Sequence, residues 1–189
     1  MAKKVLYQTV KDKGNPKEIK ENGPILCSND DAWLGHGYYF WDTFEDLSHW
    51  WGEYKLRVPY MVWKAECDFD TRYCLDLHGE PEHLALFNSM VKLVLEQDLE
   101  DDHKNTTVSD ILYYMRNIVG IDHFTSVRVS GELSIGAKNL TYNLKMPFEI
   151  GKNQFLNLLP PIQLCIYDLK KVNFREHNLI YPEKYKDAV

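Results

Sequence analysis

Two glycines, one residue apart, stand immediately before a run of aromatic residues, and this segment says more about the local backbone conformation than any other in the chain. The segment reads Gly35-His36-Gly37-Tyr38-Tyr39-Phe40. Because glycine lacks a side chain, the backbone can turn tightly there and another group can approach closely. The pattern therefore predicts a tight turn that leads into an aromatic strand. Taken alone, it fits either a turn that feeds a core strand or a loop that receives a ligand.

Strand-like and helix-like segments follow one another along the whole chain. Apolar patterns predict strands over residues 4–10, 38–41, 58–70, 73–77, 124–129, 146–150, 162–167 and 172–174. Capping residues and apolar residues at three- and four-residue steps predict helices over about 15–23, 43–54, 80–98 and 107–119. Since strands lie at both ends and helices between them, a mixed α+β fold is expected. The 189 residues contain no repeat and no convincing linker, which predicts a single domain over 1–189.

Composition argues against several classes of function. The net charge is −6, whereas duplex nucleic acids are bound by concentrated positive charge, so an extended nucleic-acid surface is not expected. No apolar run is long enough to cross a bilayer. The basic N-terminus is followed by a strand-like run too short for a signal peptide, which predicts a cytoplasmic protein. The four cysteines form no CxxC pair and have no nearby histidine at metal-ligand spacing, so reduced thiols and no metal site are expected.

Three segments occur in an order that resembles the signature of the ADP-ribosyltransferase fold. They run from Leu6 to Gln8, from Gly35 to Phe40 and from Gln163 to Asp168. The order is similar to that of the histidine-tyrosine-glutamate branch, which includes diphtheria-like toxins and poly(ADP-ribose) polymerases. The resemblance spans nearly the whole chain. It implies a split mixed β-sheet core with flanking helices and a cleft for NAD, which such enzymes use as a substrate.

The resemblance also implies roles for the residues of the middle motif and the helix after it. Tyr39 takes the place of the tyrosine that stacks on nicotinamide, and Gly35 and Gly37 take the places of the motif glycines. In the family, the next helix presents a serine and, three residues later, an aromatic residue. Ser48 and Trp51 have this separation, displaced by one residue, and a tryptophan stacks at least as well as a tyrosine. The alternative for both is a capped amphipathic helix with aromatic core residues.

Three positions depart from the family pattern. Gln8 stands where the family has a histidine that hydrogen-bonds the NAD ribose, and Thr9 stands where a glycine offers its backbone to the nicotinamide amide. Glutamine still donates and accepts hydrogen bonds, and a backbone contact tolerates most side chains. Gln163 occupies the position of the catalytic glutamate. A neutral amide can hold the ribose hydroxyl but supplies no charge to an oxocarbenium-like transition state, a loss of about 3 kcal/mol or more.

Another carboxylate is a candidate to replace the missing glutamate. Glu149 lies in a strand-like run shortly before Gln163, and it would supply the charge if the sheet brings that run beside the cleft. The alternative is an outward-facing strand residue. Asp168, at the far end of its strand, is a weaker candidate. His36, between the two glycines, is a candidate to contact phosphate or substrate, although a place in an exposed loop would explain it equally.

These residues lead to one hypothesis and two alternatives. The leading hypothesis is an NAD-dependent mono-ADP-ribosyltransferase, toxin-like or from a conflict system, that transfers ADP-ribose to a macromolecular acceptor. A protein acceptor is favoured over nucleic acid, and a regulatory or antitoxin partner fits that setting. The first alternative is a catalytically silent module that binds NAD, ADP-ribose or a protein, because two glutamines replace family residues. The second is an aromatic contact surface for protein or RNA, although the acidic charge weakens the RNA version.

Overall fold

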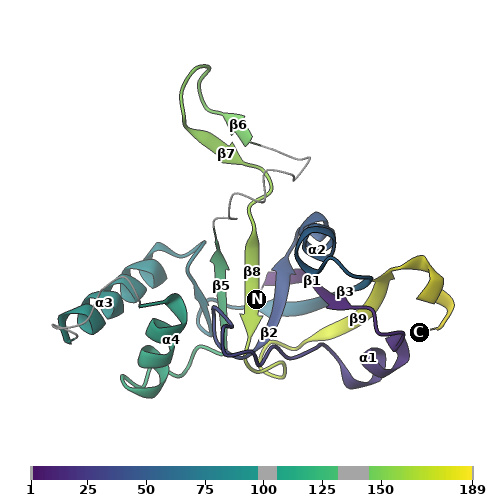
Figure 1. Ribbon diagram of the computed structural model, residues 1–189. Helices are drawn as coiled ribbons and strands as arrows, with labels where there is room; N and C mark the ends of the chain where they lie inside the picture. The colour runs from purple at the N-terminus through teal and green to yellow at the C-terminus, as the bar shows by residue number, and fades with distance from the viewer. Residues whose placement is uncertain (1, 98–105, 132–144, 189) are drawn as a thin grey trace.

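The computed structural model describes residues 2–97, 106–131 and 145–188, and it shows a mixed sheet with helices around it (Figure 1). The strands are β1 (Ala2–Lys11), β2 (Tyr38–Asp42), β3 (Tyr60–Phe69), β4 (Cys74–Asp76), β5 (Ser126–Ser130), β6 (Lys145–Pro147), β7 (Phe155–Asn157), β8 (Ile162–Ile166) and β9 (Arg175–Tyr181). The helices are α1 (Pro16–Asn22), α2 (Glu45–Trp50), α3 (Pro81–Gln97) and α4 (Val108–Asn117), with a π-helical segment (Trp51–Leu56) and a 3-10 helix (Glu183–Ala188). The α+β class expected from the sequence is confirmed.

The main sheet has seven strands in the order β4-β5-β8-β2-β1-β3-β9. β4 and β5 run parallel, and the other neighbouring strands are antiparallel. β1 pairs with β3 along its whole length, from Ala2 to Lys11, but its pairing with β2 is confined to Leu6 and Tyr7 in the described chain. The two central strands therefore separate after Tyr7, and the sheet opens between them.

Helices cover the sheet through apolar clusters. α3 and α4 lie together beside the β4 end of the sheet in Figure 1. They contribute to a cluster that joins Ile111 and Met115 of α4 to Leu75, Val127 and Cys165 of the strands. The helix expected over 107–119 is confirmed by its N-terminal cap. There Thr107 and Asp110 exchange hydrogen bonds between their side chains and each other's backbone N–H groups, which satisfies two donors at the helix start.

One expected strand is shorter than predicted and lies outside the main sheet, and another is wrong. The segment expected as a strand over 146–150 belongs to a separate hairpin of β6 and β7, which projects from the main sheet in Figure 1. β6 ends at Pro147; the N–H of Phe148 still donates to the carbonyl of Gln154 at 3.1 Å, and the chain then turns back toward β7. The segment 172–174 forms a turn in which Asn173 has a φ of +47°, a value that interrupts a strand. The last strand, β9, begins after that turn.

The described residues contain no helix with both the length and the apolar character needed to span a bilayer. The side chains of Cys27, Cys67, Cys74 and Cys165 are free thiols.

Candidate functional site

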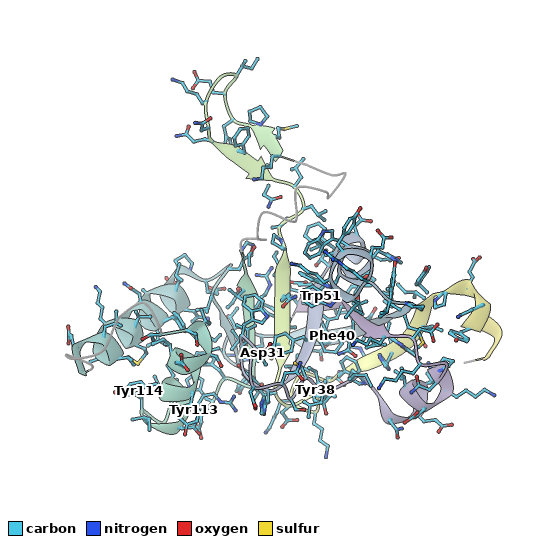
Figure 2. All side chains as sticks on the ribbon, in the orientation of Figure 1. Asp31, Tyr38, Phe40, Trp51, Tyr113 and Tyr114 are labelled. Carbon is cyan, nitrogen blue, oxygen red and sulfur yellow. The ribbon has the colours of Figure 1, made fainter. Side chains whose placement is uncertain are left out.

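A cavity lies where β1 and β2 separate. Its volume is about 560 Å³, within the range that small-molecule sites occupy. Its walls come from β1, β2, the segment between α1 and β2, the π-helical segment and one residue of β8, Gln163. Figure 2 shows three of its lining residues, Asp31, Phe40 and Trp51, near the middle of the main sheet. The cavity is thus formed at the same place where the sheet loses its pairing.

Four of the sequence-predicted site residues line this single cavity. Thr9 comes from β1, Tyr39 from β2, Trp51 from the π-helical segment and Gln163 from β8. Segments far apart in the sequence therefore meet at one site. The other predicted residues lie outside the lining; they are Gln8, Gly35, His36, Gly37, Ser48 and Glu149.

Gln163 is a buried polar residue without a complete set of partners. It lies on β8, opposite Trp41 of β2 and Val129 of β5, and its side chain is 8% exposed. Its Oε1 atom is buried and accepts no hydrogen bond. A buried polar atom left without a partner costs about 1–3 kcal/mol. Gln163 belongs to the cavity lining, so its amide can give Oε1 the missing hydrogen bond by turning toward a ligand hydroxyl or amide in the cavity.

Tyr39 belongs to the cavity lining, its side chain packs against the core cluster that contains Ile111 and Cys165, and its hydroxyl is held by the preceding loop. The hydroxyl donates to the carbonyl of Gly35 at 2.7 Å and accepts from the N–H of Leu34 at 2.9 Å. Burial, more than the nearby Cys165, raises the pKa of the Tyr39 hydroxyl far above its ordinary value. The hydroxyl therefore stays protonated, and its two hydrogen bonds fix the orientation of the ring.

The two glycines before Tyr39 serve the backbone of this loop. Gly35 has a φ of +82°, which is costly for a residue with a side chain. A Cβ on Gly37 would lie 2.5 Å from Sγ of Cys165, so glycine is required by the close approach of β8. His36, between them, is exposed. Of the two interpretations of this segment, the turn that feeds a core strand accounts for both glycines.

Gln8 lies on β1 next to the cavity, but its amide is occupied. Its Nε2 donates to the carbonyl of Ile25 at 2.9 Å and to that of Tyr39 at 3.3 Å, and its Oε1 accepts from the N–H of Ile25 at 2.8 Å. The residue is buried. In this structure Gln8 therefore joins the α1–β2 segment, which forms one wall of the cavity, to the sheet.

Thr9 and Ser48 link β1 to α2. The hydroxyl of Thr9 donates to the carbonyl of Ser48 at 2.7 Å, and the hydroxyl of Ser48 donates to the carbonyl of Glu45, inside its own helix, at 2.6 Å. Ser48 is fully buried.

The backbone groups of Thr9 have different neighbours from its side chain. The carbonyl of Val5 accepts a hydrogen bond from the N–H of Thr43, just after β2. Alternate residues of a strand direct their backbone groups to the same edge. The backbone groups of Thr9 therefore face the edge of β1 along which β2 is no longer paired.

Trp51 is held by two neighbouring indoles. Its ring centroid lies 6.0 Å from that of Trp41 and 6.3 Å from that of Trp50, both in tilted arrangements that aromatic pairs favour. Trp51 is partly buried and lines the cavity. The predicted aromatic wall is therefore present, and it is rigid because it is part of a packed cluster.

Glu149 and Asp168 lie away from the cavity. Glu149 is exposed in the turn of the β6–β7 hairpin, where its carbonyl accepts from the N–H of Lys152 at 3.2 Å. Asp168 follows β8, and its carboxylate accepts from the N–H of Lys170 at 3.0 Å. Neither carboxylate lines the cavity that contains Gln163. The cavity lining includes no described residue of the β6–β7 hairpin, which projects from the main sheet (Figure 1).

Several cavity residues were missed by the sequence analysis. Lys11, Lys13, Asn15 and Asp31, which carry polar side chains, belong to the cavity lining. The Oδ1 atom of Asn15 is buried there without a hydrogen-bond partner. These residues lie in loops or at the end of a strand, where no periodic pattern distinguishes a cavity wall from open surface.

A buried ionic network on the main sheet was also missed. The Arg128 guanidinium donates to Asp42 at 2.6 Å and to both carboxylate oxygens of Asp76 at 3.1 Å, and Lys4 donates to Asp42 at 2.9 Å. Burial raises the pKa of Asp42, but the hydrogen bonds from Arg128, Lys4 and Thr43 outweigh it and hold that pKa below its ordinary value. None of these side chains lines the cavity, so the network is structural.

Within the described part of the chain, no group of three or more His, Cys, Asp or Glu side chains is placed to hold a metal ion. No family model, no curated protein and no solved structure matches this chain.

Proposed function

We propose that this chain binds NAD in the cavity between β1 and β2 and acts as a mono-ADP-ribosyltransferase. The observation that carries the proposal is that Gln163, whose buried Oε1 has no hydrogen-bond partner, lines the same cavity as Tyr39, Trp51 and Thr9. These are four of the positions that the resemblance to the histidine-tyrosine-glutamate branch assigns to the NAD site. They lie on four elements, so their meeting at one cavity is not a consequence of closeness in sequence.

Each of the four residues has a role that its contacts permit. The rings of Tyr39 and Trp51 offer faces for the nicotinamide, because the Tyr39 hydroxyl is held by the loop and Trp51 is held by other indoles. The Thr9 backbone offers hydrogen bonds to the nicotinamide amide at the edge that β2 has left. The Gln163 amide accepts from a ribose hydroxyl and so gains the partner that it lacks in the free protein.

The reaction itself breaks the bond between the ribose C1′ and the nicotinamide nitrogen. The bonding electrons leave with nicotinamide, and an acceptor nucleophile supplies a pair to C1′. Gln163 orients the ribose but contributes no negative charge, so the proposed enzyme lacks one of the electrostatic contributions that usually dominate such steps. A slow reaction is therefore expected, with a protein favoured as the acceptor.

The test is nicotinamide release from NAD by the purified chain, together with NAD binding by calorimetry. We expect release by the wild type and a loss of binding of about tenfold or more for Gln163→Leu, which removes the acceptor and keeps a similar volume. Gln154→Leu is the matched control, because Gln154 is exposed on the β6–β7 hairpin. Glu149→Ala should also behave as the wild type. Absence of nicotinamide release by the wild type would refute the transferase, and absence of NAD binding as well would refute the NAD site.

A second candidate function is a silent module that binds NAD or ADP-ribose without cleaving NAD. The observation that favours it is the neutral side chain at position 163 together with the placement of Glu149 on the hairpin. Binding of NAD at the same cavity without any release of nicotinamide would favour this candidate. A Gln163→Glu variant that gains release would then show that only the charge was missing.

A further inference from the structure

The cavity contains a carboxylate that the sequence analysis did not consider. Of the described residues that line it, three carry charged side chains, which are Lys11, Lys13 and Asp31. Asp31 is the acidic one, and it is exposed to solvent at the same time. A residue that both lines a cavity and reaches solvent lies at its mouth, where a second reactant approaches.

The backbone that carries Asp31 is held in place. Asp30 and Asp31 are the central residues of a turn closed by a hydrogen bond from the N–H of Ala32 to the carbonyl of Asn29 at 3.1 Å. Before the turn, Cys27 and Gly37 exchange two backbone hydrogen bonds of 2.9 and 3.0 Å.

The other end of the segment is held as well. The Tyr167 hydroxyl donates to the carbonyl of Leu34 at 2.7 Å. Asp31 is therefore presented by a loop that is fixed on both sides, as a reacting group requires.

The carboxylate of Asp31 has no structural task. Three other aspartates, Asp12, Asp42 and Asp76, each accept hydrogen bonds from a cationic side chain and from other donors. In the described part of the chain no hydrogen bond or ion pair involves the Asp31 side chain. Its carboxylate is thus free to accept a proton or a hydrogen bond from a ligand without weakening the fold.

We propose that Asp31 is the catalytic base for the acceptor, an inference that rests on the proposed function. The C1′–N bond breaks and its electron pair leaves with nicotinamide. The oxygen of water or of an acceptor hydroxyl donates a lone pair to C1′, and the proton of that oxygen passes to the Asp31 carboxylate. Charge and atoms balance, because the carboxylate becomes neutral as the former cation of NAD becomes neutral nicotinamide. Asp31 supplies the base on the solvent side of the ribose while Gln163 holds the ribose from the sheet.

The experiment compares Asp31→Asn with Asp30→Asn in steady-state hydrolysis of NAD. Both changes replace a carboxylate by an amide in the same turn, but only Asp31 lines the cavity. General bases contribute about 10²- to 10⁴-fold, so we expect kcat to fall by about 10²-fold or more for Asp31→Asn, with KM for NAD little changed. Asp30→Asn should match the wild type. Both variants should keep the wild-type melting temperature, because no partner of either carboxylate is lost in the turn.

Azide provides a readout that a structural role would not change. It is a nucleophile that carries no proton to be removed, so it needs no base. Azide should restore nicotinamide release in Asp31→Asn and form ADP-ribosyl azide. Wild-type hydrolysis with an unchanged Asp31→Asn rate, or a slow Asp31→Asn variant that azide fails to rescue, would overturn the role of Asp31 and leave the proposed function standing. No nicotinamide release by the wild type would overturn both.

Discussion

Gln8 and Ile25 exchange two hydrogen bonds between a strand and a loop that lie apart in the sequence. The Gln8 side chain donates to the Ile25 carbonyl at 2.9 Å and accepts from the Ile25 N–H at 2.8 Å. This pair joins the α1–β2 segment to β1 and so fixes one wall of the cavity. A glutamine at this position has a structural use that does not depend on a ligand.

Removing the hydrogen bonds between Gln8 and Ile25 should lower the free energy of unfolding. Gln8→Ala removes the three hydrogen bonds of a buried amide, two with the backbone of Ile25 and one with that of Tyr39, and each contributes about 0.5–1.5 kcal/mol net. We expect a loss of about 2–4 kcal/mol in the free energy of unfolding, measured by urea denaturation. Gln154→Ala, on the exposed hairpin, should change stability by less than about 0.5 kcal/mol. Equal effects of the two changes would contradict the role of Gln8.

The aromatic wall should carry a measurable share of the affinity for NAD. Trp51→Ala removes a ring from the cavity, and stacking of a base on an aromatic side chain is worth about 1–3 kcal/mol. We expect about tenfold or weaker NAD binding by calorimetry. Tyr54→Ala is the control, because Tyr54 lies in the same π-helical segment, is exposed and does not line the cavity. Unchanged affinity for NAD in Trp51→Ala would mean that NAD binds outside this cavity.

Replacing the buried Arg128 should lower the free energy of unfolding far more than replacing the exposed Arg72. Arg128→Met leaves the carboxylates of Asp42 and Asp76 buried without their guanidinium partner, and breaking such a pair costs about 3–5 kcal/mol. Arg72→Met breaks an exposed pair with Asp70, which is worth at most about 1 kcal/mol. Thermal or urea unfolding of the two variants gives the comparison. A loss of stability in Arg128→Met no larger than that in Arg72→Met would mean that water replaces the guanidinium as the partner of the two carboxylates.

His177 should make the fold less stable in mild acid. Burial, with a smaller contribution from Lys20, lowers the pKa of His177 to about 4, whereas an unfolded histidine titrates near 6.5. Between these values the unfolded chain binds a proton that the folded chain does not, so the free energy of unfolding falls as the pH drops.

The size of this effect follows from the pKa difference. The loss between pH 7 and pH 5 should be about 2 kcal/mol at most. His177 stacks on Trp63 with centroids 4.6 Å apart, and His177→Phe keeps a ring there without the titration. The difference in stability between wild type and His177→Phe should therefore change with pH in this window. A difference that is constant from pH 7 to pH 5 would contradict the lowered pKa.

Local patterns in the sequence were sufficient for most of the secondary structure. The helix that begins after Thr107 was identified from its capping residues, and the strand after Gly37 from the glycines and aromatics. Both signals arise within a few residues, where backbone preference and capping act. The strand expected over 146–150 extends only to Pro147, and it joins a separate hairpin because an apolar run does not show which sheet a strand joins.

The meeting of Thr9, Tyr39, Trp51 and Gln163 was anticipated through the order of three motifs, and the structure places all four at one cavity. The tasks of Gln8 and Ser48 were not anticipated. Their partners, Ile25 and Glu45, are chosen by the packing of a loop and a helix against the sheet, and nothing in the local sequence encodes that choice.

The sequence by itself determined the α+β class, most of the helices and strands, and a set of candidate residues, because these depend on short-range preferences. Only the tertiary structure decided which candidates share a cavity, that Glu149 lies on a separate hairpin and that Asp31 lines the same cavity as Gln163. The reason is physical. The cavity exists because β1 and β2 stop pairing after Tyr7, and strand pairing joins residues whose distance in the sequence sets no limit on their distance in space.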